Sequence, residues 1–418
     1  MKRVNWPVRI IVRGFLRLHA GVTRLFALLG PRARDPGPDG WIVLLTGTFY
    51  SDNWINAHLR PLAASRRTAI VHVVATYPVP QGDKIRLHMP PRWLVRLCGA
   101  VVARLLLFLW LGLRLRPHLV GGFHLLFNGL MAATLARLVG ARSLYFCVGG
   151  PAEVLDGGLQ SENRLFEKLG APDPVAERQL IGAACRIDLI VTMGSSGRRF
   201  FRERGAPAVV TISGGLDAAL YPSRGQRAEF DLIFVGRLAS IKRLDLLLGA
   251  LALARRQRPA IRAVIVGDGP ERASLEAQAR QLGLGECVRF AGHQTQIASW
   301  LARARLFVMC SDTEGLSLAL MEAMLCGLPA VVPAVGDLGD LVRDGENGCL
   351  IVERTPQAYA ARLVDLLGDD ARLQRFGAAA RRLAQRYELA VCAARWDAIL
   401  ATPAFQAPDD LELTTRAG

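Results

Sequence analysis

Residues 306–322 read LFVMCSDTEGLSLALME, and this stretch decides the fold. Its first five residues are apolar and predict a buried strand, while the residues after Glu314 have the pattern of a helix. A helix that begins after a strand presents unpaired N–H groups and a partial positive charge, which suit a diphosphate or a sugar hydroxyl. Glu314 and Glu322 differ by a net rotation of about 80° on a helix, so both carboxylates can address one elongated ligand. The helix dipole alone also favours acidic residues at such a position.

Two further junctions of strand, glycine loop and helix lie upstream. Residues 232–238 read LIFVGRL and are followed by Lys242 and an apolar-periodic helix, which places two cations, Arg237 and Lys242, beside a glycine loop. The chain has only four lysines among its 52 basic residues, and a compact ammonium suits a point contact to phosphate. Residues 263–270 read AVIVGDGP, a predicted strand that runs into a turn. Taken singly, these patterns are also those of surface helix starts and ordinary turns.

In this order and spacing, the three pieces resemble the C-terminal half of the family 4 retaining glycosyltransferases, which have the GT-B fold. The resemblance covers about residues 230–352. It rests on VGRL at 235–238 with Lys242, VGDGP at 266–270, VRFAG at 288–292, EG at 314–315 with EAM at 322–324, CGLPAV at 326–331 and DGENGCL at 344–350.

The resemblance implies a donor site for a nucleotide sugar, UDP- or GDP-linked, with no other cofactor. Arg237 and Lys242 would hold the diphosphate, Glu322 the ribose hydroxyls and Glu314 the hydroxyls of the transferred sugar. The reaction implied is retaining transfer of a hexose-like sugar without a protein nucleophile. The remaining residues expected to bind substrate on this side are Gly236, Gly315, Leu316 and Ser317, with base contacts from the backbone near Arg289 and Phe290.

Apolar runs alternate with helical patterns along the chain, as in parallel sheets covered by helices. We therefore expect an α/β protein of the GT-B class, with two doubly wound, Rossmann-like domains facing across a cleft. The predicted parts are a basic amphipathic segment at 1–36, an acceptor-side domain at 37–222, a nucleotide-sugar-binding domain at 223–382, and a crossover helix with a tail at 383–418. The predicted strands are 41–45, 70–75, 119–123, 143–148, 189–192 and 208–212 in the first domain, and 232–235, 263–266, 287–290, 306–310, 330–332 and 348–351 in the second.

Composition agrees with a folded enzyme of this size. The chain has 418 residues, 51% hydrophobic and 21% charged, which excludes a disordered protein. Its eight cysteines show no C-x-x-C spacing, so we expect reduced thiols, no zinc site and a cytoplasmic location. The sequence lacks an Asp-x-Asp cluster, so an essential divalent metal is not indicated.

Positive charge is concentrated in the N-terminal half. Met1–Arg34 contains eight basic residues and Lys84–Ala152 contains nine, neither contains an acidic one, and the net charge of the whole chain is +16. In the first segment the apolar residues lie opposite an arc of arginines, namely Arg9, Arg13, Arg17 and Arg24. This is the pattern of a basic amphipathic helix, and we expect it to lie at an anionic membrane, the inner face of the plasma membrane.

The second basic segment includes Leu97–Leu113, whose single charge is Arg104. Because a central arginine costs roughly 2.5 to 3.5 kcal/mol on insertion scales, we expect a buried or interface-lying helix and no membrane span. Ordinary domain helices with solvated cations remain an alternative for either segment. Nucleic-acid binding is disfavoured because no recognition motif is present.

The acceptor side is predicted from two positions. Gly47 follows the first strand, where the family commonly carries a glycine pair. His124 lies between a strand and the helix expected at 130–138, so it can face a cleft and take part in catalysis, although a lone histidine is more often structural. The family often has a further histidine near residues 147–150, and this chain has none there.

Taken together, the sequence predicts a bacterial glycosyltransferase that extends a lipid-linked or saccharide acceptor in cell-envelope or exopolysaccharide synthesis. A catalytically idle GT-B scaffold that binds a nucleotide or a protein partner is the alternative. A sugar epimerase or phosphorylase of the same shape would leave the basic N-terminal segment without a purpose.

Overall fold

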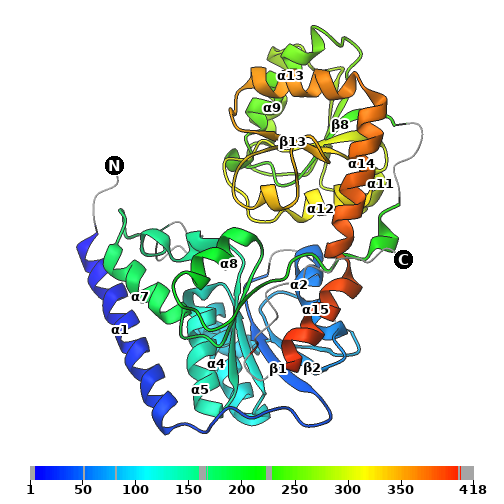
Figure 1. The fold of residues 1–418 in the computed structure, drawn as a ribbon. Coiled ribbons are helices and arrows are strands. Elements are labelled where there is room, and N and C mark those ends of the chain that lie inside the picture. Colours follow the sequence, from blue (N-terminus) through cyan, green and yellow to red (C-terminus); the bar gives the residue numbers. More distant parts are fainter. Residues whose placement is uncertain are drawn as a thin grey trace. The chain divides into compact units, whose positions relative to one another are not determined.

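The computed structural model describes residues 5–49, 52–80, 82–159, 166, 168–222, 228–402 and 405, and the chain divides into two compact units (Figure 1). Unit 1 comprises Met1–Gly215 with Leu389–Gly418, and unit 2 comprises Leu216–Glu388. The unit boundaries at 215/216 and 388/389 differ by seven and six residues from the predicted positions 222/223 and 382/383. The N-terminal segment, predicted as a part of its own, falls inside unit 1.

The described residues of unit 1 form a seven-stranded parallel sheet in the order β3-β2-β1-β4-β5-β6-β7. Two groups of helices cover it: α4, α5 and α7 on one face, α2 and α15 on the other (Figure 1). The strands are β1 (Trp41–Thr46), β2 (Thr68–Val74), β3 (Ile85–His88), β4 (Leu119–Phe123), β5 (Arg142–Cys147), β6 (Leu189–Thr192) and β7 (Val209–Thr211). The helices are α1 (Trp6–Leu29), α2 (Asp52–Ala64), α3 (Arg92–Cys98), α4 (Ala100–Leu115), α5 (Leu130–Val139), α7 (Pro174–Ala184), α8 (Ser195–Arg202) and α15 (Leu389–Ala401).

The described residues of unit 2 form a six-stranded parallel sheet in the order β10-β9-β8-β11-β12-β13. Its strands are β8 (Phe230–Val235), β9 (Ala263–Val266), β10 (Val288–Gly292), β11 (Ala304–Val308), β12 (Ala330–Pro333) and β13 (Gly348–Ile351). Its helices are α9 (Leu244–Arg255), α10 (Arg272–Gln281), α11 (Ile297–Leu301), α12 (Leu318–Leu325), α13 (Pro356–Leu367) and α14 (Asp370–Ala384).

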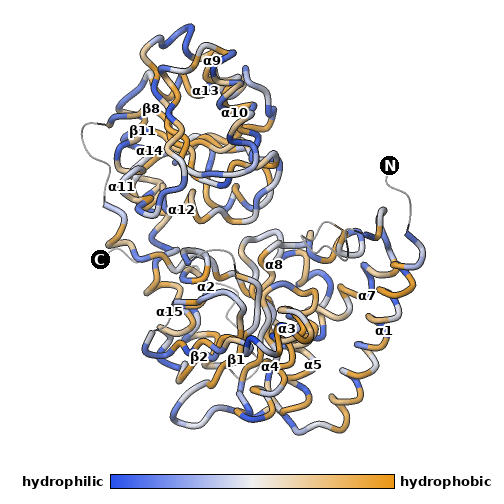
Figure 2. The backbone as a smooth tube through the Cα atoms, turned by 180° about the vertical axis from the view of Figure 1, so that it is seen from behind, coloured by the Kyte–Doolittle hydropathy of each residue, from blue (hydrophilic) through white to orange (hydrophobic). Residues whose placement is uncertain are grey.

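The predicted α/β class with two doubly wound sheets is confirmed. All twelve predicted strands are present within two residues of their expected ends. They were recognisable because both faces of each sheet are covered, so the strands are continuous apolar runs. The same runs are coloured hydrophobic in β8 and β11 in Figure 2.

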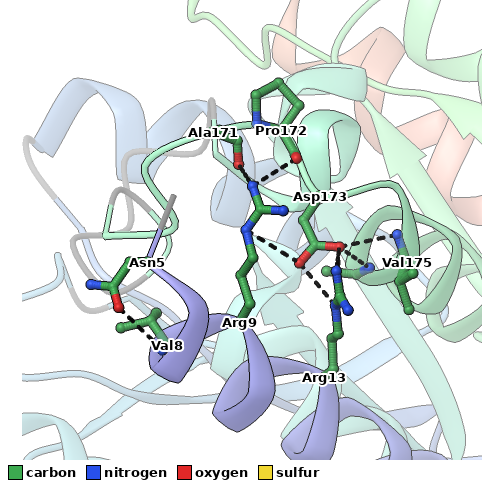
Figure 3. Close-up of polar contacts among 9 residues, drawn as sticks. Asn5, Val8, Arg9, Arg13, Ala171, Pro172, Asp173 and Val175 are labelled. Atoms are coloured by element: carbon green, nitrogen blue, oxygen red, sulfur yellow. Dashed lines mark hydrogen bonds and ion pairs between the residues drawn. The ribbon is translucent and has the colours of Figure 1, made fainter. Parts of the chain in front are cut away.

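Helix α1 is present as predicted, but its arginines do not all lie on its free side (Figure 3). The Arg13 guanidinium hydrogen bonds to both carboxylate oxygens of Asp173, at 2.9 to 3.2 Å. Arg9 is buried and donates to the carbonyl oxygens of Ala171 (2.7 Å) and Pro172 (2.9 Å). Asp173 is fully buried and also caps α7 by accepting from the N–H groups of its first turn. The helix is therefore docked on its own unit through residues expected to face an anionic membrane.

The apolar stretch predicted as one helix is divided in two. Gly99, with φ of +81°, separates α3 from α4. Arg104 is buried in α4 and donates to the carbonyl oxygen of Gly47 and to Oδ1 of Asn128. Among the described residues, no helix combines the length and the hydrophobicity that crossing a bilayer requires.

Candidate functional site

The first candidate site lies in unit 2, where the strand order reverses between β8 and β11. Ligands of doubly wound sheets bind at such a reversal, beyond the carboxyl ends of the strands. The Nζ atom of Lys242, in the loop after β8, lies 2.5 Å from Oε1 of Glu314, in the loop after β11. Ser311 Oγ donates to the same oxygen at 2.6 Å. The side chains of Lys242 and Glu314 are 23% and 11% exposed, so a ligand can still reach this ion pair.

Glycines allow the backbones around this pair to approach closely. Gly336 has φ of +54°, and a Cβ atom on it would lie 1.7 Å from the carbonyl oxygen of Glu314. A Cβ on Gly267 would lie 1.8 Å from the carbonyl oxygen of Gly236, so the loops after β8 and β9 are packed backbone against backbone. Gly236 itself donates its N–H to Val266 at 3.0 Å. The position of Glu314 is thus set by the loop after β12, which the sequence did not indicate.

Glu322 lies on α12 and is 4% exposed. Burial raises the pKa of its carboxyl group to about 7, although a hydrogen bond from Tyr221 favours the ionised form. The Tyr221 hydroxyl donates to Oε1 of Glu322 at 3.0 Å. A carboxyl group that is half protonated near neutral pH can accept from, or donate to, a ligand hydroxyl.

The other residues predicted on the donor side differ in how far they are exposed to solvent. Arg237 and Gly315 are exposed, and Leu316 is partly buried against the core of unit 2. Ser317 is the N-cap of α12 and accepts from the N–H of Leu320 at 3.3 Å. The helix begins at Leu318, so residues 315–317 and their N–H groups belong to the loop before it.

The side chain of Arg289 contacts residues that precede strands β8 and β11, away from the carboxyl ends of these strands. Its guanidinium lies 3.7 Å from Glu229, which precedes β8, and 5.2 Å from the ring centroid of Trp300. Phe290 packs against the core. The structure therefore does not bring the Arg289 side chain to the Lys242–Glu314 pair.

Ion pairs shape the loop that carries Lys242. Arg243 has φ of +50° and precedes α9. Its guanidinium bonds to Asp245 at 3.0 Å and to Asp312 at 3.3 Å, and Asp312 also pairs with Arg354 at 2.7 Å. These bonds connect the loops after β8 and β11. A hollow of about 630 Å³ opens beside them, between the starts of α9 and α10.

The second candidate site lies in unit 1, beyond the carboxyl ends of β1 and β4, where its strand order also reverses. Gly47 follows β1, and a Cβ there would lie 2.9 Å from Cβ of Phe123. His124 follows β4, and its Nδ1 lies 3.1 Å from Oε1 of Glu153. The ring of His58, on α2, is buried beside Trp54, and burial lowers its pKa to about 4. Glu153 and His58 were not recognised in the sequence because no local motif surrounds them.

The described residues contain neither a candidate metal-binding cluster nor a disulfide. No group of three or more His, Cys, Asp or Glu side chains in that part of the chain could hold a metal ion. All eight cysteines belong to the described part, and none of them forms a disulfide.

The comparison with protein families defines a class for the second unit. Residues 224–383 match the sequence model of the glycosyl transferases group 1, so this part of the chain is a domain of that class.

Particular curated proteins match about half of this chain. The D-inositol 3-phosphate glycosyltransferase of Thermobispora bispora is 35% identical over 251 residues, which cover 54% of this chain and 58% of that protein. The glycogen synthase of Mycobacterium tuberculosis is 33% identical over 203 residues, 47% of this chain and 49% of that protein. The chain thus spans about half the length of the curated relatives it matches.

A similar fold over most of the chain is found in solved structures. The protein HepE of Anabaena, solved in complex with UDP and glucose, has a TM-score of 0.66 at 20% identity. The match covers 87% of this chain and 100% of that one. The predicted GT-B fold class is therefore confirmed.

Proposed function

We propose that the protein is a glycosyltransferase that moves a sugar from a nucleoside diphosphate to an acceptor. The observation that carries this proposal is the Lys242–Glu314 ion pair at the strand-order reversal of a glycosyl transferases group 1 domain. A relative named as a glycosyltransferase, another named as a glycogen synthase and a structural neighbour that holds UDP and glucose support it.

In the proposed reaction, unit 2 binds the donor. Negative charge develops on the diphosphate as it leaves, and Lys242 with the exposed Arg237 stabilises that charge. Glu314 already has one carboxylate oxygen held by Lys242 and Ser311, so its other oxygen can accept from the hydroxyls of the sugar. Glu322 takes the ribose hydroxyls in place of Tyr221. Transfer proceeds with retention at the anomeric carbon and without a metal, with a UDP- or GDP-linked donor.

The acceptor we propose is a lipid-linked saccharide at an anionic membrane surface, because unit 1 presents apolar helix faces to its outside. With Arg9 and Arg13 docked inward, the outer face of α1 consists of aliphatic residues that are 49 to 83% exposed, namely Ile10, Ile11, Leu18, Leu25, Leu28 and Leu29. Arg17 and Arg24 are exposed beside them. This is the arrangement of a helix that lies in a bilayer interface.

A second apolar face runs along α3 and α4. Trp93 is 65% exposed, Leu97 76% and Trp110 54%. Exposed arginines stand at both ends of this face, namely Arg92, Arg96, Arg114 and Arg116. Apolar side chains with interfacial tryptophans and flanking arginines suit the headgroup region of an anionic membrane. Such an attachment places the protein on the inner face of the plasma membrane and favours a role in envelope or exopolysaccharide synthesis.

The donor is tested with a set of nucleotide sugars. A ligand present at about 100 times its Kd adds roughly 2.7 kcal/mol to the stability of the folded chain, which a thermal-unfolding screen detects. With the donor identified, Lys242→Ala is expected to lower kcat/KM by about 10² to 10³. Arg256→Ala, which removes an exposed cation at the end of α9, is the control and should leave kcat/KM unchanged.

Donor hydrolysis by the purified chain separates the enzyme from an idle scaffold. An enzyme releases nucleoside diphosphate from its donor, at least slowly, even without an acceptor. A chain that is stabilised by a nucleotide sugar but neither hydrolyses nor transfers it would be a nucleotide-binding scaffold, and the proposed function would be wrong.

A further inference from the structure

Unit 1 contains a buried carboxylate that the donor chemistry does not use. Glu153 lies in the short 3-10 helix η2 (Gly150–Glu153) after β5 and is 4% exposed. Its Oε1 accepts from the N–H of Gly149 at 2.7 Å and lies 3.1 Å from Nδ1 of His124. Its Oε2 accepts from the N–H of Leu125 at 2.8 Å and from the hydroxyl of Tyr145 at 2.8 Å. A buried carboxylate with this many partners fixes the groups around it.

The groups fixed by Glu153 include a strained turn. His124 has φ of +62° and ψ of 143°, a conformation that residues with a Cβ atom rarely adopt. Two partners of Glu153, the ring of His124 and the N–H of Leu125, belong to this turn, and two others belong to the end of β5 and the loop after it. Gly149 makes the approach possible, because a Cβ there would lie 2.9 Å from Cγ of Glu153. Glu153 therefore joins the two loops at the position of His124.

The charges around Glu153 keep it ionised. Burial alone would raise the pKa of its carboxyl group, but the nearby His124 and the N–H groups of Gly149 and Leu125 outweigh burial and lower it. Burial raises the pKa of Tyr145, so its hydroxyl stays a neutral donor. His58, on α2, is neutral at pH 7 because burial lowers its pKa to about 4. Cys147, on β5, contributes a thiol whose Sγ contacts the carbonyl oxygen of Gly150 at 3.3 Å.

We propose that Glu153 is a positioning residue for His124. By accepting the hydrogen on Nδ1 it fixes the ring and its tautomer, so that Nε2 is the nitrogen that accepts a hydrogen bond from a hydroxyl of the saccharide substrate. The ionised carboxylate also stabilises the protonated ring. The hydrogen bond from the saccharide to His124 rests on the proposed function, whereas the pairing of Glu153 with His124 does not.

The pairing is tested by histidine-labelled NMR on the full chain, with the signal of His124 assigned from its loss in His124→Gln. In the wild type, we expect the neutral ring of His124 to carry its hydrogen on Nδ1. In Glu153→Gln, we expect a mixture of tautomers and a proton affinity of His124 that is lower by roughly tenfold or more, the effect of removing a negative charge at this distance. Tyr145→Phe is the matched control, because it removes one donor to the same carboxylate and leaves its charge in place; His124 should titrate nearly as in the wild type.

Glu153→Asp keeps the negative charge and replaces Glu153→Gln in the test if the latter does not fold. In Glu153→Asp we expect His124 to retain the Nδ1–H tautomer and a proton affinity close to the wild-type value. A folded Glu153→Gln protein whose His124 keeps the wild-type tautomer and titration would overturn the inference. So would a folded Glu153→Asp protein whose His124 shows the mixed tautomers and the tenfold weaker proton binding expected on losing the charge.

Kinetics add a readout that separates the two proposals. Glu153→Gln and His124→Ala should each lower kcat/KM by about 10² or more, and the double variant should lose little beyond the larger single effect, because both changes remove the same unit. A wild-type chain that transfers no sugar would contradict the proposed function, and the NMR titration would still decide the pairing. An active enzyme in which the two losses multiply would contradict the positioning role.

Discussion

Among single residues, Glu322 makes the stability of unit 2 depend on pH. Burial raises the pKa of its carboxyl group from 4.5 to about 7. Between these values the folded chain binds a proton that the unfolded chain releases, so the free energy of unfolding falls as the pH rises through this window and levels off above it. The total fall is on the order of 3 kcal/mol. In Glu322→Gln this contribution is absent, and urea unfolding at the two ends of the window measures the difference.

Tyr221→Phe sharpens that test. The Tyr221 hydroxyl favours the ionised carboxylate, so its removal should raise the pKa of Glu322 further and extend the fall in stability to higher pH. Equal slopes for the wild type, Glu322→Gln and Tyr221→Phe would show that Glu322 does not titrate in this range.

Gly336 tests how tightly the position of Glu314 is set. In Gly336→Ala the new Cβ would overlap the carbonyl oxygen of Glu314, so the loop after β11 must move. A displacement of about 1 Å at such a site can cost roughly 10² in rate, and kcat/KM measured with the identified donor should fall accordingly. Gly345→Ala is the control: Gly345 has φ of +75°, but a Cβ atom on it would have no neighbour within 4 Å. An equal loss in both variants would point to backbone strain and not to the contact with Glu314.

The residues of the candidate site differ in how far the sequence predicts them. Lys242 and Glu314 stand in local strand–loop–helix patterns, and the structure brings them together. Gly336, Tyr221 and Glu153 contribute through contacts between segments far apart in sequence, and no pattern around them signals this. The family resemblance implied base contacts from the backbone near Arg289, whereas the contacts of its side chain with Glu229 and Trp300 join segments that no local pattern links.

Among the elements, α1 is held on unit 1 in part by one buried carboxylate, that of Asp173. Asp173 binds Arg13 and caps α7, and it lies 4.0 Å from the Nε atom of the buried Arg9. Asp173→Ala leaves these cations without their partner and removes the cap, so unfolding free energy should fall by about 3 to 5 kcal/mol. Arg17→Ala, on the exposed flank of the same helix, should change it by about 0.5 kcal/mol or less. Urea titration of both variants measures the contrast; similar values would mean that α1 is not docked through Asp173.

The orientation of α1 shows what helical periodicity can and cannot predict. The wheel correctly separates an arginine arc from an apolar arc, but it cannot tell which arc faces the protein. The answer depends on Asp173, which lies more than a hundred residues away and is buried at the start of α7. The strand β3 was missed for a local reason, since it is a four-residue edge strand with alternating Arg86 and His88 and no continuous apolar run.

For the whole molecule, alternating strands and helices predict two parallel sheets, because a parallel connection needs a crossover helix. The order of the strands within each sheet cannot be predicted from local sequence patterns. In both sheets the order reverses between the first and the fourth strand, which places Gly47 and His124 together in unit 1 and the loops of Lys242 and Glu314 together in unit 2. The topology thus gathers residues that lie far apart in the sequence and that each follow a strand.

The charge and the apolar faces of the molecule lead to a prediction about membranes. Vesicles that contain anionic lipid should bind the chain at low salt and release part of it at high salt, since exposed arginines such as Arg24 each contribute about 1 kcal/mol near such a surface. Arg24→Ala should therefore weaken binding roughly fivefold at low salt. Leu28→Glu and Trp110→Glu should weaken it at every salt concentration, because they place a carboxylate in the apolar faces of α1 and α4.

Val352→Glu supplies the matched control, since Val352 in unit 2 is 84% exposed and Leu28 in α1 is 83% exposed. The two changes introduce the same charge at the same exposure, so co-sedimentation that drops for Leu28→Glu and not for Val352→Glu locates the contact on unit 1. If both variants lose binding equally, net charge alone drives the association. If neither variant loses binding, the apolar faces of α1 and α4 do not contact the lipid. The proposal of a lipid-linked acceptor then loses its structural support.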